Sequence, residues 1–263
     1  MKTNVIVLTL IATLGIIFGC SNDNVTSPKN DTGTLRVLLT DATAAYDAVN
    51  VTFSEVSVHL GNEISEADSL SNWIVISDEV KTFDLLTLSN GATSLLGEKT
   101  LDEGHYTQLR LTLTDAEVVV DGTPYKLDVP SGVLKFVSGF DIKDETPMEL
   151  IVDFDAARSI HQTGKKGDYK LKPTIRIIKQ TETGSIGGTV INYSNLPVAY
   201  AIAGADTITT TPVNSDNGRF TLAFLSVGTY SVAVTDTLGL VFTNPSVSVT
   251  VGVKTNLGDI TLH

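Results

Sequence analysis

Residues 108–114, QLRLTLT, decide the fold class of this chain. Leucine occupies every second position, and polar residues fill the positions between. Because side chains alternate between the two faces of a strand, this spacing predicts a β-strand with one buried face. The same period recurs in GTLRVLLTD (33–41) and in ELIVDFD (149–155). In the latter, the apolar side chains are expected to point inward, and Asp153 and Asp155 to point to the opposite face.

The stretch AVNVTFSEVSVHL, residues 48–60, carries the same alternation with a change of phase. Apolar side chains fall on odd positions up to Phe53 and on even positions from Val56 onward. A strand that keeps one face toward the core needs an extra residue where the phase changes. We therefore predict a β-bulge near Ser54–Glu55.

Helical patterns are few. Residues 85–96 fit a short helix or turn that the SNG sequence at 89–91 interrupts, and residues 155–162 fit one helical turn. Residues 33–180 are therefore predicted to form a mostly antiparallel β-domain, folded as a sandwich.

An ordered set of segments gives residues 33–178 a family resemblance. The set comprises GTLRVLLTDATAAYDAVNVTFSEVSVHL, the single Trp73, FDLLTL, LDEGHYTQLRLTL, KLDVPSG and DYKLKPTIRI. In this order the segments resemble the family known as domain of unknown function 4382, which is common in lipoproteins of Bacteroidetes-type bacteria. That family has no established activity, so the resemblance implies a type of domain and no particular chemistry.

Composition changes after the glycine-bearing stretch TETGSIGG (181–188), which marks the predicted domain boundary. Strand-like segments then alternate with turn signals at a spacing of about 8–12 residues, which predicts a seven-stranded β-sandwich over 184–263. Residues 214–236 resemble the carboxypeptidase regulatory-like, or transthyretin-like, sandwich, a group that includes carbohydrate-binding-like folds. Asp216-Asn217-Gly218 within this segment predicts a turn rather than a calcium loop, since no closing acid follows nearby.

The first 20 residues predict an export signal. Lys2 gives a positive start, and the apolar run of about 14 residues that follows is too short to span a bilayer as a helix. The run ends in Ile17-Phe18-Gly19-Cys20, which resembles the lipobox of bacterial lipoproteins. This resemblance implies that residues 1–19 are a cleaved signal peptide and that Cys20 carries the lipid. The polar stretch 20–32 is predicted to be a flexible tether.

Charge and cysteine content exclude several classes of function. A formal net charge of −12 disfavours nucleic acid and anionic lipid surfaces as partners. Because Cys20 is the single cysteine, the chain cannot form an internal disulfide, a thiolate metal site or a second cysteine nucleophile. Lipoproteins that enterobacteria retain in the inner membrane carry Asp after the lipidated cysteine. Here that residue is Ser21, so the outer membrane is the predicted location.

Motifs for catalysis or metal binding are missing from the sequence. It contains no G-x-S-x-G nucleophile elbow, no phosphate-binding loop and no H-E-x-x-H zinc helix, so we predict no catalytic residues, metal ligands or cofactors. The histidines lack ligand-like spacing and are expected to be structural or solvated: His59, His105, His161 and His263. One alternative stays open. If the loop holding Asp41 and Asp47 met Asp153 and Asp155 in space, a Ca²⁺ site or a hydrolase-like pair of acids could form.

Basic and aromatic residues offer weaker candidates. Alternating cations within 158–179 predict the wet face of one strand, balanced by neighbouring acids, rather than an anion site: Lys170, Lys172 and Arg176. Glycan binding uses exposed aromatic rings. Trp73 is expected in a core, and Tyr46 is the better candidate for an exposed ring.

These observations together predict an all-β protein with two antiparallel sandwich-type domains. The expected function is that of a lipid-anchored bacterial envelope protein with a non-enzymatic binding or structural role. Its expected partners are the membrane, through the lipid on Cys20, and a glycan or a surface protein. The alternatives are a carbohydrate-binding surface lipoprotein and an acid-dependent hydrolase that uses Asp41, Asp47 or Asp153. The sequence does not identify the residues that would bind a ligand.

Overall fold

The computed structural model describes residues 31–61, 72–129, 132–143, 147–164 and 167–263. Residues 31–263 form one compact unit. Cys20, the predicted signal peptide and nearly all of the predicted tether lie outside the described residues. None of the helices in the described part is long and apolar enough to cross a membrane.

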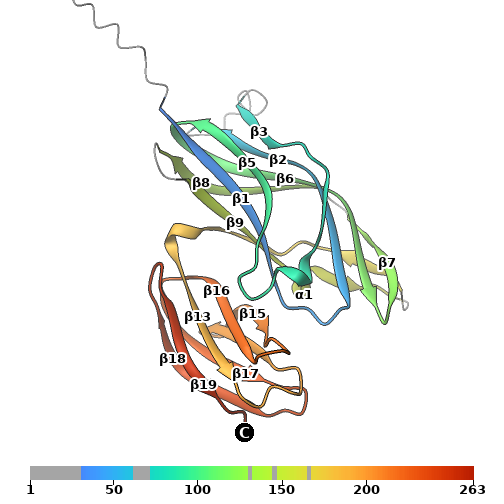
Figure 1. Ribbon diagram of the computed structural model, residues 1–263. Coiled ribbons are helices and arrows are strands. Elements are labelled where there is room, and N and C mark those ends of the chain that lie inside the picture. Colours follow the sequence, from blue (N-terminus) through green and yellow to red (C-terminus); the bar gives the residue numbers. More distant parts are fainter. Residues whose placement is uncertain (1–30, 62–71, 130–131, 144–146, 165–166) are drawn as a thin grey trace, which may run out of the picture. The chain divides into compact units, whose positions relative to one another are not determined.

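Strands make up most of the described chain and helices very little of it, which confirms the all-β prediction (Figure 1). They form four sheets, and the buried hydrophobic side chains gather in two separate clusters. The first cluster contains residues between Leu35 and Leu171, and the second contains residues between Ile186 and Leu262. The predicted boundary at 181–188 falls at the transition between them, and the division into two domains stays a prediction.

The first sheet has the strand order β12-β9-β1-β5. Strand β1 lies between β5, which runs antiparallel to it, and β9, which runs parallel to it (Figure 1). The bounds are β1 (Thr32–Ala42), β5 (Ser94–Asp102), β9 (Met148–Asp155) and β12 (Ile175–Lys179).

The second sheet packs against the first over the larger hydrophobic cluster, and β2 and β6 form its centre. Its strands are β2 (Ala48–Leu60), β3 (Trp73–Ser77), β4 (Lys81–Asp84), β6 (Gly104–Val120), β7 (Thr123–Asp128), β8 (Val133–Ile142), β10 (Ile160–Gln162) and β11 (Tyr169–Leu171). The register between β2 and β6 shifts between Phe53 and Glu55, so the predicted bulge at Ser54 is confirmed. The three leucines of QLRLTLT are all buried, as their alternation predicts.

Among the described residues, helices are limited to three short segments: η1 (Leu85–Leu88), α1 (Ala156–Ser159) and η2 (Gln180–Glu182). The Asp84 side chain accepts a hydrogen bond from the Leu86 amide and so caps η1. The helical signal at 85–96 is therefore correct only for its first turn. Residues from Ser94 onward belong to β5, a strand that the sequence pattern does not reveal.

The second hydrophobic cluster lies between two further sheets, ordered β16-β13-β19 and β15-β14-β17-β18. All seven strands expected from the turn spacing are present: β13 (Thr183–Val190), β14 (Val198–Ala203), β15 (Asp206–Pro212), β16 (Arg219–Ser226), β17 (Gly228–Thr235), β18 (Val241–Val249) and β19 (Lys254–Ile260). Gly218 has a φ of +71°, and a Cβ there would lie 2.3 Å from the Val190 carbonyl oxygen. Only glycine fits this turn, which confirms the turn interpretation of Asp216-Asn217-Gly218.

Strand β9 departs from the predicted alternation because both of its faces are buried. Leu150, Val152 and Phe154 point to the core as expected, but Ile151 is fully buried and Asp153 is only 6% exposed. The face that carries Asp153 is covered because residues of β15 and β16 line a small cavity together with it. The expectation that this face of β9 would be wet is therefore wrong.

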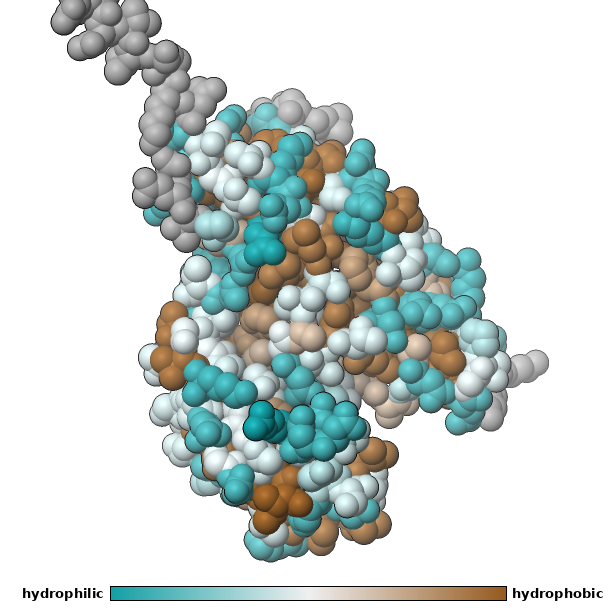
Figure 2. Space-filling model, in the orientation of Figure 1, coloured by the Kyte–Doolittle hydropathy of each residue, from teal (hydrophilic) through white to brown (hydrophobic). Residues whose placement is uncertain are grey.

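The surface mixes polar and apolar side chains. On the face shown in Figure 2, hydrophobic residues are interspersed with hydrophilic ones. The most exposed large hydrophobic side chains in the described ranges include Val137 (81%), Leu238 (72%) and Leu196 (69%).

Candidate functional site

Three aspartates meet where β1 and β9 end. The two strands are parallel, and their register pairs Thr40 with Asp153 and Ala42 with Asp155. Because parallel strands end at the same edge of a sheet, this register brings Asp41 close to both acids of β9. We call Asp41, Asp153 and Asp155 the carboxylate cluster. The sequence raised this juxtaposition as an open alternative, and the fold brings these three residues together.

Asp47 is not part of the carboxylate cluster. Its Oδ2 atom accepts a hydrogen bond from the Gly122 amide at 2.8 Å, in the turn between β6 and β7. Asp47 therefore holds a turn of the second sheet, and the loop that carries it does not bring it to Asp153.

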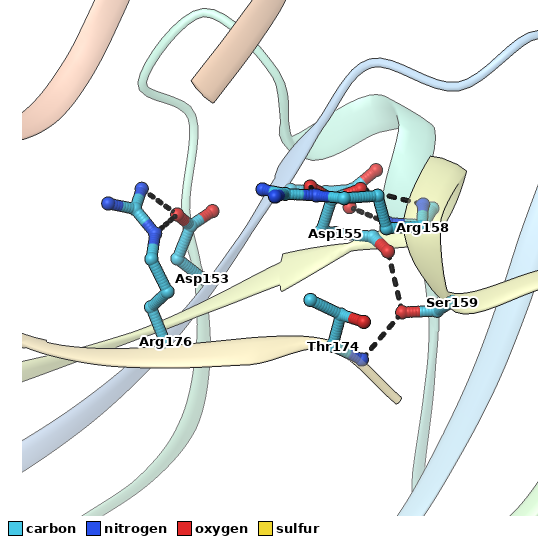
Figure 3. A network of polar contacts seen from close by, with 8 residues as sticks. Asp153, Asp155, Arg158, Ser159, Thr174 and Arg176 are labelled. Carbon is cyan, nitrogen blue, oxygen red and sulfur yellow. Dashed lines mark hydrogen bonds and ion pairs between the residues drawn. The ribbon is translucent and has the colours of Figure 1, made fainter. Parts of the chain in front are cut away.

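Asp153 forms a largely buried ion pair with Arg176 of β12. The Arg176 Nε atom donates to the Asp153 Oδ2 atom at 2.9 Å, and Nη2 donates to the same oxygen (Figure 3). The Asp153 side chain is 8% exposed and that of Arg176 is 34% exposed. Burial raises the pKa of Asp153, and the Arg176 guanidinium opposes this rise.

Asp155 caps the single turn of α1. Its carboxylate accepts from the Arg158 amide at 2.8 Å and from the Arg158 Nε atom at 2.5 Å. Figure 3 shows Ser159 between Asp155 and Thr174, and its hydroxyl donates to the Asp155 carbonyl oxygen while it accepts from the Thr174 amide. Ser159 is fully buried. Its two hydrogen bonds join α1 to the approach of β12, which is a structural role.

Asp41 has a different environment from its neighbours. It is 6% exposed, and its Oδ1 atom accepts a hydrogen bond from the Ala156 amide at 3.0 Å. Its Oδ2 atom is buried and has no hydrogen-bond partner. Burial raises the pKa of Asp41 well above its ordinary value, and the negative charges of Asp153 and Asp155 act in the same direction.

Metal binding finds little support in this geometry. Within the described ranges, no group of three or more His, Cys, Asp or Glu side chains is arranged to hold a metal ion. In the carboxylate cluster, the arginine partners of Asp153 and Asp155 occupy oxygens that a cation would need.

Asn90 is a residue that the sequence interpretation missed. Its backbone amide donates to the Thr211 Oγ1 atom at 2.9 Å. In its side chain, the Nδ2 atom donates to the Pro212 carbonyl oxygen and the Oδ1 atom accepts from the Thr221 amide, each at 2.9 Å. Asn90 therefore joins the turn after η1 to strands β15 and β16. The Asn90-Gly91 pair marked a turn, with φ values of 59° and 82°, but a turn signal does not reveal what the side chain contacts.

The histidines occupy ordinary structural or exposed positions. His59 is 2% exposed, with its Nδ1 atom 3.3 Å from the Thr107 hydroxyl and its ring edge-on to Trp73. His105 lies on the surface, 2.7 Å from an Asp141 oxygen, and its hydrogen bond lowers the pKa of Asp141. His161 and His263 are exposed.

Two aromatic expectations are wrong. Trp73 is half-buried and lies on the face of β3 opposite Ile76, with the Arg110 guanidinium 3.7 Å from the centre of its ring. Trp73 is outside the core because Ile74 and Ile76, on the other face of β3, are the residues that pack against the first hydrophobic cluster. Tyr46 is not freely exposed, since it is half-buried against the first core, and burial raises the pKa of its hydroxyl.

The basic residues Lys170 and Arg176 lie on two different strands, whereas the sequence predicted one. Lys170 belongs to β11, with its Nζ atom 3.7 Å from an Asp128 oxygen, whereas Arg176 belongs to β12 in the other sheet. The expected balance by neighbouring acids is confirmed for both residues. The expectation of one continuous strand is wrong, because the chain leaves β11 after Leu171.

Two hollows of similar size lie near these residues. One, of about 630 Å³, has Tyr169 as an aromatic wall, and its other lining side chains are mainly polar: Thr114, Asp115, Lys126, Asp128, Thr163 and Asp168. The other, of about 610 Å³, lies beside α1 and is lined mostly by small and aliphatic side chains, with Asp155, Arg158 and Tyr200 as polar contributions. Hollows of this size are common places for ligands on proteins.

A family model described as Domain of unknown function (DUF4382) matches residues 32–173. The chain belongs to the DUF4382 family. The DUF4382 match contains the whole carboxylate cluster and ends before Arg176 of β12. The ion pair with Asp153 therefore joins a residue within the matched DUF4382 segment to one that lies beyond it.

No curated protein sequence matches the chain significantly. Among solved structures, the DUF4382 protein is similar to the Bacillus anthracis TIE protein, with 12% identity, a TM-score of 0.24, and coverage of 88% of this chain and 34% of that one. It is also similar to BcpA, the major pilin subunit of Bacillus cereus (11% identity, TM-score 0.22, coverage 88% and 70%). A third similar structure is GBS52, the minor pilin of Streptococcus agalactiae (11% identity, TM-score 0.21, coverage 86% and 94%). The DUF4382 protein thus spans about a third of the first of these proteins, and TM-scores this low do not establish a shared fold.

Proposed function

We propose that this protein is a lipid-anchored envelope protein whose β-rich body has a non-enzymatic binding or structural role. The segment Ile17-Phe18-Gly19-Cys20 carries this proposal, because it ends a short apolar run and resembles a lipobox. A thioether-linked diacylglycerol and an amide-linked acyl chain on Cys20 would hold the body durably at a membrane. Ser21 favours the outer membrane.

The contacts of the acidic residues support a non-enzymatic role. A general acid, a base or a nucleophile must come within hydrogen-bond reach of a substrate. Asp153 is bound to Arg176, Asp155 caps α1, and Asp47 caps the turn at Gly122. These carboxylates stabilise the protein's own structure, which accounts for their positions without a catalytic role.

Protease treatment of intact cells tests the location of the body, and membrane fractionation tests the anchor. Wild-type protein and the Cys20→Ala variant are compared by mass spectrometry of the released peptides, with Ser21→Ala as the matched control. We expect the wild type and Ser21→Ala to fractionate with the outer membrane and Cys20→Ala to lose that association. Retention of Cys20→Ala in the outer membrane would contradict the lipid anchor. Peptides released from intact cells would place the body outside, where a surface partner is to be sought.

Carbohydrate binding is a second candidate, and the hollow beside Tyr169 favours it. Sugars are commonly bound by an aromatic ring next to hydrogen-bonding side chains, and Tyr169 lies among Asp128, Asp168 and Thr163. The Tyr125 ring supports Tyr169, with ring centroids 5.4 Å apart.

A glycan array screened with purified protein tests this second candidate. Tyr169→Phe keeps the ring and Tyr169→Ala removes it, so a sugar bound here is expected to be retained by the first variant and lost by the second. Equal binding by both variants would place the sugar elsewhere, and an array without any signal would argue against carbohydrate binding.

A further inference from the structure

The charges in the carboxylate cluster do not balance when every group is ionised. Asp153 has Arg176 as its partner, and Asp155 has Arg158. Asp41 has neither arginine, so three carboxylates face two guanidinium groups and one negative charge is left over. That charge would belong to the most isolated acid, Asp41.

The hydrogen bonds of Asp41 indicate which form of the carboxyl group fits the site. One oxygen accepts from the Ala156 amide, and the other is buried without a partner. A buried carboxylate without a cation is strongly disfavoured, and such a group keeps its proton instead. A neutral carboxyl group accepts through one oxygen and carries the proton on the other. This form removes the unpaired charge, and its hydroxyl needs one acceptor, for which the adjacent hollow has room for a water molecule.

The strands packed against Asp41 provide no cation for it. On the β9 and α1 side the charged groups are Asp153, Asp155 and Arg158, and Arg176 of β12 is bound to Asp153. On the other side, Asp41 lines a small, partly open cavity of about 10 Å³ together with residues of β15 and β16. Apart from Asp41 and Asp153, none of the side chains lining this cavity is ionisable: Thr40, Asn90, Gly91, Thr209, Thr210, Thr211, Thr221, Ala223 and Phe224. A cavity of this volume accommodates about one water molecule.

We propose that Asp41 is a proton-binding site of the folded protein, and that release of its proton loosens the contact between the end of β1 and strand β15. An ionised Asp41 requires hydration, and a cavity with room for about one water must widen to supply it. Close to Asp41 in the chain, a backbone hydrogen bond joins the Thr43 amide to the Thr210 carbonyl oxygen of β15 at 3.4 Å. This long hydrogen bond lies two residues after Asp41, so it is the first contact that opening would break.

The direction of the pH effect on stability follows from the difference in proton binding by Asp41 between the folded and unfolded states. An unfolded Asp loses its proton near pH 4, whereas burial raises the pKa of Asp41 in the folded protein. Between these two values the folded state holds one proton more than the unfolded state. Below about pH 4, Asp41 therefore makes its full contribution to the stability of the folded state. As pH rises above this value the contribution is lost, and the equilibrium constant for unfolding increases by up to tenfold for each pH unit.

Hydrogen exchange of the full-length protein tests the proposal. Exchange is followed by mass spectrometry from about pH 5 to pH 8 and corrected for the intrinsic pH dependence of amide exchange, in the wild type, Asp41→Asn and Asp47→Asn. We expect the wild type and Asp47→Asn to lose protection at residues 40–43 and 207–212 as pH rises. Asp41→Asn, which is neutral throughout, should keep its protection.

Three results would overturn the proposal. The first is wild-type protection that does not change with pH, and the second is an Asp41→Asn variant that loses protection in parallel with the wild type. The third is recovery of wild-type protection at pH 8 on adding Ca²⁺, which would mean that a cation binds there instead of a proton. Should Asp41→Asn fail to fold, the carboxyl carbon resonance of Asp41 in the wild type decides, because a shift typical of an ionised group at pH 5 contradicts the proposal.

Discussion

Strand β1 carries two charged residues, Arg36 near its middle and Asp41 at its end, and their charges are stabilised in different ways. Arg36 lies on the surface between Glu98 of β5 and Glu149 of β9, and its side chain is 38% exposed. Asp41 is buried with one oxygen unpartnered. Water shares the stabilisation of the Arg36 charge, whereas at Asp41 the protein must provide it alone. The two positions of one strand therefore show how burial and partners decide the stabilisation of an ionisable group.

The largest effect is expected where a buried charge loses its partner. Arg176→Met leaves Asp153 buried without a cation, and we expect a loss of about 2–4 kcal/mol in the free energy of unfolding at pH 7. Urea denaturation measures it. The loss should shrink toward pH 4, because Asp153 can then take up a proton. An equal loss at both pH values would mean that Arg176 acts through packing alone.

The next effect has the opposite sign. Asp41→Asn removes an acid whose anionic form is destabilised by burial, so we expect a gain in unfolding free energy at pH 8 that shrinks as pH falls and disappears near pH 4. Thermal or urea denaturation across this range measures the difference between the two proteins. A loss of stability at pH 8 would show that the carboxylate form of Asp41 is the stabilising one.

Asn90→Gly tests the contact between the turn after η1 and strands β15 and β16. Glycine keeps the left-handed backbone at this position but removes the side-chain bonds to Pro212 and Thr221, and we expect a loss of about 1–2 kcal/mol. Faster exchange of the Thr221 amide should accompany it. Asn90→Asp is a second variant, which keeps the acceptor for Thr221 and replaces the donor to Pro212 by a carboxylate oxygen. If all three proteins exchange alike, the bridge does not stabilise the contact.

The smallest effect is expected at Arg36, the exposed charged position of β1. Arg36→Met breaks two ion pairs that water already screens, so the expected loss is about 0.5 kcal/mol, falling further in high salt. Denaturation in low and high salt measures it, with Arg176→Met as the reference. A loss as large as that of Arg176→Met would contradict the proposed difference between exposed and buried charges.

The period of apolar residues predicts where the strands lie, but not which other segments of the chain cover their faces. Alternation located the buried leucines of β6, the bulge at Ser54 and all seven strands of the second sandwich. It failed for β9, whose second face looks wet in sequence because Asp153 is polar. Covering that face depends on residues of β15 and β16, more than 50 positions away along the chain, and no local pattern encodes such a contact.

The candidate site was predictable only as a set of residues. The sequence identified Asp41, Asp153 and Asp155 as acids that could meet, and it included Asp47 because this residue shares a loop with Asp41. The parallel pairing of β1 and β9 decides which of them do meet. Asn90 was overlooked because a turn signal reports backbone conformation, and the contacts of its side chain depend on the tertiary fold.

The parallel pairing of β1 with β9 also has a consequence for the order of folding. Arg36 and Glu149 are neighbours in the sheet although they are 113 positions apart in the chain. The first sheet therefore cannot be completed until this segment has been synthesised, and contacts so distant in sequence close slowly. If the chain is exported unfolded, as the proposed signal peptide implies, such a delay keeps it unfolded until its last strands have crossed the membrane.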